Sequence, residues 1–291
     1  KHIRTYTIHS NQLLLLKENA LQRAFSFNSC CCLLTEGKGV DKYGAFDFLI
    51  AYDVLDSIQL EQSNSETRKA FLERHASSYI FCALSYDLKN LYEASLLSSN
   101  QDHVETPGSF WLVYKKVLRL NGLDLSIYAD DYASLNEWAF IDPSKNETKF
   151  SEKESSSINL KLRTSKDEYL KDIENIQNAI RSGSVYELNY CQEFYAEQCS
   201  IDPLSIFKRM LATNAAPFSV LFKWKQHCLL SASPERFLAK RGDLLIAQPI
   251  KGTRRRLSDI AADNRQKEDL QQCIKERAEN VMIVDLVRND L

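Results

Sequence analysis

The stretch ERAENVMIVDLVRNDL, residues 276–291, joins two acidic residues to an apolar run and contributes most to the fold prediction. Glu276 and Glu279 are three residues apart, so a helix would place both carboxylates on one face. Two such carboxylates repel each other unless a cation offsets their charge. They suit Mg²⁺, which takes one or two carboxylates and keeps water at its remaining positions. The alternative is a solvated helix face beside Lys275 and Arg277.

Further candidate groups lie upstream, in SASPERF at 231–237 and in QPIKGTR at 248–254. Glu235 and Lys251 follow neighbouring predicted strands, and they could face each other across a hairpin-like connection. A lysine that loses its proton is a nucleophile, and a protonated carboxyl can donate its proton to a leaving hydroxyl. Either residue could instead be structural. Lys251 would then be an ordinary surface residue, and Glu235 would pair with Arg236 or Arg254.

Local patterns in the second half of the chain predict helices and strands in alternation. Ser165 followed by Glu168 forms a capping box, which predicts a helix that ends at Gly183. Asp202-Pro203 predicts the start of another helix, which runs to about Leu211. A long helical pattern runs from about Asn264 to the end. We predict strands at 185–195, 219–224, 228–231 and 244–248.

The first half mixes short apolar segments with polar helical stretches. We predict strands at 46–53, 79–84 and 109–117, a helix at 63–75, and burial of Cys30, Cys31 and Cys32 on a strand. A polar, serine-rich break then separates the two halves. The predicted organisation is an N-terminal region 1–141, a linker or excursion 142–160, and a catalytic region 161–291. Grouped strands with interspersed helices indicate the α+β class.

Composition excludes several classes of protein. A net charge of −2 does not suggest a nucleic-acid binder, even with the short basic run 254–256. With 8 glycines, the chain contains neither a dinucleotide-binding nor a P-loop glycine motif. Its 8 cysteines form no C-x-x-C pair, so no zinc spacing is present. No apolar run is long enough to span a membrane. We expect a cytoplasmic protein with reduced thiols.

Four segments in fixed order carry a resemblance to a known family: GSVYELN at 183–189, SASPERF, QPIKGTR and the stretch 276–291. Together they resemble the chorismate-utilising enzymes. The resemblance covers about 160–291 firmly, and Leu33–Glu36 and Phe81–Asp87 more loosely. It implies a two-lobed α+β sandwich of antiparallel sheets with flanking helices. It also implies that a C-terminal stretch beyond Leu291 completes the site.

Position 251 distinguishes the branches of this family. Anthranilate synthases have alanine there, whereas Lys251 is similar to the aminodeoxychorismate synthase branch. The resemblance makes Lys251 the nucleophile that attacks chorismate at C2 and expels the C4 hydroxyl, with Glu235 as the general acid. It assigns substrate binding to Thr253, Gly252 and Asn189.

The resemblance also implies a cofactor and partners. Glu279 would bind Mg²⁺ directly, with Glu276 close by. The expected reaction converts chorismate and ammonia to 4-amino-4-deoxychorismate, on the path to p-aminobenzoate and folate. A separate glutamine amidotransferase subunit would supply the ammonia. The alternatives are an anthranilate synthase and a non-catalytic chorismate-binding subunit. Glu187 departs from the branch, in which glutamine is usual.

Overall fold

A computed structural model describes residues 2–35, 41–93, 95, 101–132, 135, 158–214 and 216–291. The chain divides into two compact units, which are described separately: 1–147 with 207–291, and 148–206. Most of the predicted linker, 142–160, lies outside the described residues, as does Glu36. The predicted boundaries of the N-terminal and catalytic regions therefore stay predictions.

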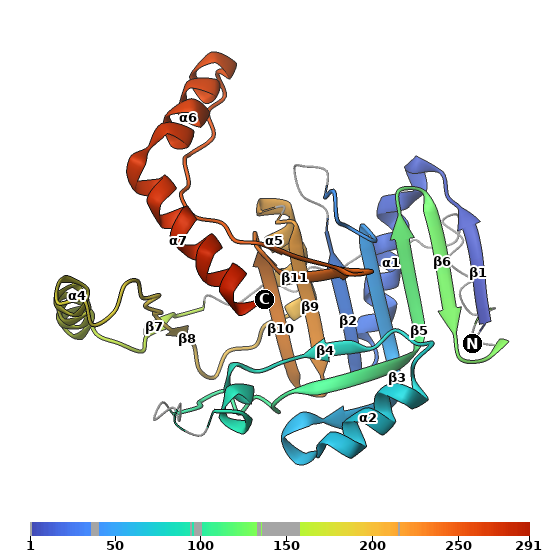
Figure 1. Cartoon of the computed structure of the whole chain (residues 1–291). Helices are drawn as coiled ribbons and strands as arrows, with labels where there is room; N and C mark the ends of the chain where they lie inside the picture. Colours follow the sequence, from blue (N-terminus) through green and yellow to red (C-terminus); the bar gives the residue numbers. More distant parts are fainter. Residues whose placement is uncertain are drawn as a thin grey trace. The chain divides into compact units, whose positions relative to one another are not determined.

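The larger unit is built on an eight-stranded sheet whose described pairs are all antiparallel. Figure 1 shows its strands side by side, with β4 beside β5. The strand order is β1 (His2–Thr7), β6 (Asp124–Ala129), β5 (Phe110–Asn121), β3 (Phe48–Gln59), β2 (Ser29–Leu34), β9 (Phe218–Trp224) and β10 (His227–Ser233), and β4 (Phe81–Ala83) pairs with β5. The predicted α+β class with antiparallel sheets is confirmed.

The core of this sheet forms around β2, which lies between β3 and β9. Side chains alternate between the two faces of a strand, so Cys31 joins Leu49 and Ala51 on one face, while Cys30 and Cys32 point to the other. The helix α1 (Leu13–Phe25) packs on β2 and β3. All three cysteines are buried, which confirms their predicted position on a strand.

Elements around β3 and β5 close this core. The helix α2 (Ser65–Arg74) begins at a cap in which the side chain of Asn64 accepts the N–H of Thr67 at 2.9 Å. This helix confirms the prediction for 63–75. Three short 3-10 helices occupy Ser10–Gln12, Leu60–Gln62 and Tyr86–Leu91. In the described part of the chain, no helix is long and apolar enough to cross a membrane.

The part of the larger unit that follows β10 is a hairpin and two helices: β11 (Arg236–Arg241), β12 (Leu244–Gln248), α6 (Ile260–Gln272) and α7 (Ile274–Asp290). The sequence analysis missed β11. It also predicted one long helix, which was wrong, because Cys273 has an extended backbone with ψ of 113° and separates α6 from α7.

The smaller unit contains α4 (Lys166–Arg181) and a short pair of strands, β7 (Lys161–Leu162) and β8 (Phe194–Tyr195). The capping box is confirmed, since the Ser165 hydroxyl accepts the N–H of Glu168 and the glutamate accepts the N–H of Ser165. The strand predicted at 185–195 was wrong except for its last two residues. The helix α5 (Pro203–Thr213) confirms the prediction from Asp202-Pro203 and crosses the boundary between the units.

Candidate functional site

The hairpin of β11 and β12 brings the segments of Glu235 and Lys251 together. Arg236 is paired with Gln248 in the strand register, and its Nε donates to the Gln248 side chain at 2.8 Å. Just outside this pair, the carboxylate of Glu235 accepts the N–H of Ile250 at 3.3 Å. The Glu235 carboxylate therefore contacts the residue that precedes Lys251, and the expectation that Glu235 and Lys251 face each other stays a prediction.

The structural alternative for Glu235 was an ion pair with Arg236 or Arg254. Arg236 instead pairs with Asp41, and its guanidinium lies 4.8 Å from the centroid of the Phe218 ring. Arg254 pairs with Glu276. Each arginine thus has a different carboxylate as its described partner, which favours a role for Glu235 other than charge pairing with these two.

The Lys251 segment also touches α7. Lys251 is half-buried, and Gly252 follows it with a φ of +75°, a backbone conformation that favours glycine. A Cβ at Gly252 would lie 2.7 Å from Oε2 of Glu276. Arg254 Nη1 lies 3.4 Å from the other carboxylate oxygen of Glu276. The segment that carries the predicted nucleophile therefore packs against one of the two predicted metal carboxylates. Thr253, which lies between Gly252 and Arg254 in the sequence, is exposed.

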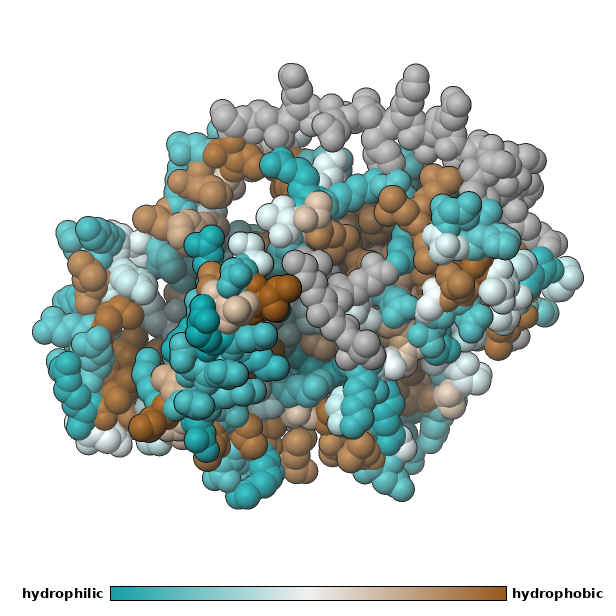
Figure 2. All heavy atoms as spheres, turned by 90° about the horizontal axis from the view of Figure 1, so that it is seen from above, coloured by the Kyte–Doolittle hydropathy of each residue, from teal (hydrophilic) through white to brown (hydrophobic). Residues whose placement is uncertain are grey.

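The face of α7 that carries the two glutamates is the less exposed one. The side chains of Glu276 and Glu279 are 17% and 34% exposed, whereas Val281 is 66% exposed and Leu286 is 56% exposed. The other charged side chains of α7 point outward, with Lys275 and Arg288 each 78% exposed and Asp285 63% exposed. The two glutamates are thus partly shielded from water, and the metal site and the solvated helix face both stay predictions. Figure 2 shows other hydrophobic side chains at the surface among hydrophilic ones.

The two carboxylates fit a divalent cation in charge and chemistry. Each already faces a cationic side chain: Glu276 faces Arg254 at 3.4 Å, and Glu279 faces Lys275 at 3.5 Å. Among the described residues, no three His, Cys, Asp or Glu side chains gather as a metal site. Two carboxylates are nevertheless enough for Mg²⁺, which fills its other positions with water or substrate oxygens.

Two of the three arginines in the basic run 254–256 form ion pairs. Arg254 binds Glu276, while Arg256 binds Asp263 on α6 at 2.8 Å. Both arginines therefore tie the segment after β12 to the helices that follow. Sequence reasoning missed these roles. The run itself was visible, but its partners are 22 and 7 residues away and no local pattern identifies them.

Asn189 belongs to the smaller unit, where it is exposed in a segment without regular structure. Glu187 is half-buried in the same segment. The neighbouring Tyr190 hydroxyl donates to Asp172 on α4 at 2.6 Å, and this hydrogen bond raises the pKa of Tyr190. The bond ties the segment to α4. The substrate-binding role of Asn189 stays a prediction.

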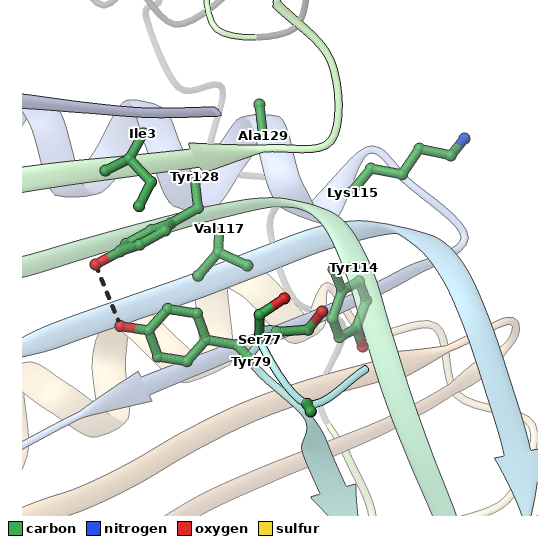
Figure 3. Close-up of a pocket in the computed structure, with 10 residues that line it drawn as sticks. Ile3, Ser77, Tyr79, Tyr114, Lys115, Val117, Tyr128 and Ala129 are labelled. Atoms are coloured by element: carbon green, nitrogen blue, oxygen red, sulfur yellow. Dashed lines mark hydrogen bonds between the residues drawn. The ribbon is translucent and has the colours of Figure 1, made fainter. Parts of the chain in front are cut away.

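A cavity of about 320 Å³ lies elsewhere, on the part of the sheet formed by β1, β5 and β6. Figure 3 shows Tyr79 and Tyr128 with their hydroxyls facing each other, 3.5 Å apart, while Lys115 points away from them. None of the site residues predicted from the sequence lines this cavity. The candidate site is therefore the hairpin, the Lys251 segment and α7.

Comparisons with known proteins agree with the sequence motifs. A family model described as chorismate binding enzyme matches residues 14–291. The chain is 40% identical over 124 residues to aminodeoxychorismate synthase component 1 of Salmonella typhimurium, which covers 43% of this chain and 27% of that protein. It is 39% identical over 119 residues to an anthranilate synthase component 1 of Haloarcula marismortui, covering 41% and 24%.

The solved structure of anthranilate synthase component I from Streptococcus pneumoniae TIGR4 has the same fold, with a TM-score of 0.70 at 18% identity. That match covers 87% of this chain and 63% of the solved chain. The chain therefore corresponds to less than two thirds of this relative, and its matches cover about a quarter of each curated relative named above.

Proposed function

Since the family match extends over nearly its whole length, the chain belongs to the chorismate binding enzyme family, and from this membership we propose that it comes from an aminodeoxychorismate synthase component I. One observation carries the proposal. The carboxylate of Glu235 accepts the N–H of Ile250 at 3.3 Å, so the proposed acid lies at the base of the hairpin, against the residue that precedes Lys251. A carboxylic acid and a lysine amine that act together on one substrate can displace a hydroxyl, which is the role we propose for them.

In the proposed reaction, the neutral amine of Lys251 attacks C2 of chorismate, the two ring double bonds shift from C1=C2 and C5=C6 to C1=C6 and C4=C5, and the C4 hydroxyl leaves. Glu235 donates a proton to that hydroxyl, which departs as water. Ammonia then adds at C4, both double bonds shift back, and the C2–nitrogen bond to Lys251 breaks. The sum is chorismate plus ammonia giving 4-amino-4-deoxychorismate plus water. Gly252, Thr253 and Asn189 are proposed to bind the substrate.

Glu279 and Glu276 are proposed to hold Mg²⁺, which when bound would offset the negative charge of a carboxylate substrate. Glu276 lies in the first turn of α7, where the positive end of the helix dipole favours an ionised carboxylate. The contact between Gly252 and Glu276 would keep this pair close to the Lys251 segment.

Two alternatives remain. The similarity to an anthranilate synthase component 1 favours a second amination reaction, in which chorismate yields anthranilate. Lys251 weighs against it, because alanine stands there in the anthranilate synthases that the sequence resembles. A non-catalytic chorismate-binding subunit would need neither a nucleophile nor an acid.

The proposal includes a partner and a location. Relatives of this chain are named component 1, which implies a second subunit, and we propose that this is a glutamine amidotransferase that supplies ammonia. All eight cysteines lie among the described residues as free thiols, which supports a reducing compartment such as the cytoplasm.

The test is mass spectrometry of the intact protein that contains this chain, after incubation with chorismate, Mg²⁺ and ammonium. We expect 4-amino-4-deoxychorismate in solution. Without ammonium, we expect an adduct on Lys251 with the mass of chorismate less one water. Lys251→Ala should abolish the adduct, whereas Lys240→Ala, at an exposed lysine on β11, should not. Anthranilate as the product, or an adduct that persists in Lys251→Ala, would contradict the proposal.

A further inference from the structure

We infer that Arg254 is a resident counter-cation of Glu276, which a divalent cation must displace before it can bind the α7 carboxylates. The inference rests on the proposed metal site but concerns a residue to which no role in that site has been given. It starts from the ion pair between Arg254 Nη1 and Glu276 Oε1, at 3.4 Å.

The surroundings of this ion pair shield it partly from water and hold the carboxylate in place. The Glu276 side chain is only 17% exposed and that of Arg254 is 37% exposed, so water screens the pair less than it screens a fully exposed pair. The carboxylate lies against the backbone of Gly252, because a Cβ there would approach Oε2 to 2.7 Å. One oxygen of Glu276 thus faces the guanidinium while the other lies against the main chain.

A cation that binds Glu276 meets the positive charge of Arg254 at the same carboxylate. Either the guanidinium withdraws, at the cost of the ion pair, or the two cations stay close and repel each other. Both outcomes lower the affinity for the metal. An ion pair at this exposure corresponds to about two- to fivefold in binding.

Arg256 provides a matched control, since it lies two residues away and also pairs with a carboxylate. Its guanidinium binds Asp263 on α6 at 2.8 Å rather than a carboxylate of α7. Removing Arg256 subtracts the same charge from the same segment but leaves the contact at Glu276 in place. If the charge of the segment as a whole lowers metal affinity, removing either arginine should raise that affinity. If Arg254 competes with the metal at Glu276, only its removal should do so.

The experiment titrates the intact protein that contains this chain with Mn²⁺ and measures the free ion by electron paramagnetic resonance. Arg254→Gln is expected to bind Mn²⁺ about two- to fivefold more tightly than the wild type. Arg254→Lys, which keeps the charge, and Arg256→Gln are expected to stay within twofold of it. Equal or weaker binding by Arg254→Gln would overturn the inference, as would equal tightening by Arg256→Gln.

The double variant Glu276→Gln with Glu279→Gln separates this inference from the proposed function. If it binds Mn²⁺ as the wild type does, the α7 metal site is wrong and the inference is wrong with it. If the double variant loses Mn²⁺ binding while Arg254→Gln binds Mn²⁺ as tightly as the wild type, the metal site stands and only the counter-cation role is wrong. If only Arg254→Gln binds Mn²⁺ measurably, the inference is supported in its strongest form.

Discussion

The sheet of the larger unit buries most of the apolar side chains on its central strands, whereas the helices α6 and α7 bury none of theirs. In β3, the five residues from Phe48 to Tyr52 are all buried, and β2 has five of its six residues buried. In α6 and α7, no described residue is buried, and Val281 and Leu286 are exposed. Both regions belong to the larger unit, but only the sheet forms a hydrophobic core.

This difference separates the source of stability from the source of the proposed chemistry. Burial of apolar area supplies most of the folding free energy, so the sheet around β2, β3 and β5 holds the unit together. The hairpin and α7 contribute ion pairs and hydrogen bonds, which are individually weak at exposed positions. The candidate groups Glu235, Lys251 and Glu276 all lie in this second region. Its geometry therefore depends on few contacts, and single substitutions can test each one.

Thiol reactivity should give the largest contrast between the two regions. Burial raises the pKa of Cys30 from 9.0 to about 12, so its thiolate population falls roughly a thousandfold. Cys199 is exposed in the smaller unit. Alkylation with iodoacetamide at pH 8, followed by peptide mass mapping, should label the exposed Cys199 much faster than the buried Cys30 in the folded chain. The rates should converge in denaturant, and similar rates in the folded chain would contradict the burial of β2.

The free energy of unfolding should respond very differently to truncation in the two regions. Leu112 on β5 is fully buried, so Leu112→Ala should cost about 3 kcal/mol through lost burial and a cavity. Phe237 on β11 is 92% exposed, and Phe237→Ala should change stability by less than about 0.5 kcal/mol. Urea denaturation followed by circular dichroism measures both. A cost above 1 kcal/mol for Phe237→Ala would show that the hairpin shares the core.

Sequence reasoning worked where the physical cause is local. The capping box of Ser165 and Glu168 lies within one turn, so the helix it begins was predictable. Burial of Cys31 was also predictable, because an apolar run between polar segments is most stable in the interior of the protein. The proximity of Glu235 to the Lys251 segment was expected from a hairpin-like connection, although the strand β11 that forms this hairpin was missed.

The same reasoning failed where a partner far along the chain decides the outcome. Residues 185–195 alternate as a strand does, but only Phe194 and Tyr195 find a partner strand, and unpaired backbone does not form a sheet. The strand β11 has an exposure pattern with one buried residue, Ala239, so no alternation marks it in the sequence. The pairing of Arg236 with Asp41 spans 195 residues. No local pattern predicts such a contact.

Replacing the glycine that has a positive φ at the candidate site should lower stability by a smaller amount, and only locally. Gly252→Ala places a side chain at a φ of +75° and 2.7 Å from the Glu276 carboxylate. We expect a local cost of about 1–2 kcal/mol, seen as faster amide hydrogen exchange in the first turns of α7. Gly242→Ala is the matched control, because its φ is +59° but a Cβ there meets nothing within 4 Å. Faster exchange in α7 for both variants alike would disprove the contact with Glu276.

The smallest expected effect is electrostatic and lies in the sheet region, at Asp56. Burial alone would raise the pKa of Asp56, but the hydrogen bond from His75 at 2.8 Å, the N–H of Ser57 and the charge of Arg74 outweigh it and lower that pKa. A lowered pKa in the folded state contributes stability above the ordinary aspartate value of 3.8, and this contribution is lost as the pH falls through the folded value.

Asp56→Asn should therefore lower the free energy of unfolding by less than about 1 kcal/mol at pH 7. The deficit should shrink as the pH is lowered below 3.8, because the wild type then loses the same charge. Urea titrations of both proteins from pH 7 to pH 3 measure this difference. Asp87→Asn is the control, since Asp87 pairs with Lys89 at 62% exposure and water screens that pair strongly. A deficit for Asp56→Asn that stays constant down to pH 3 would mean that lost packing, not charge, explains the effect of the substitution.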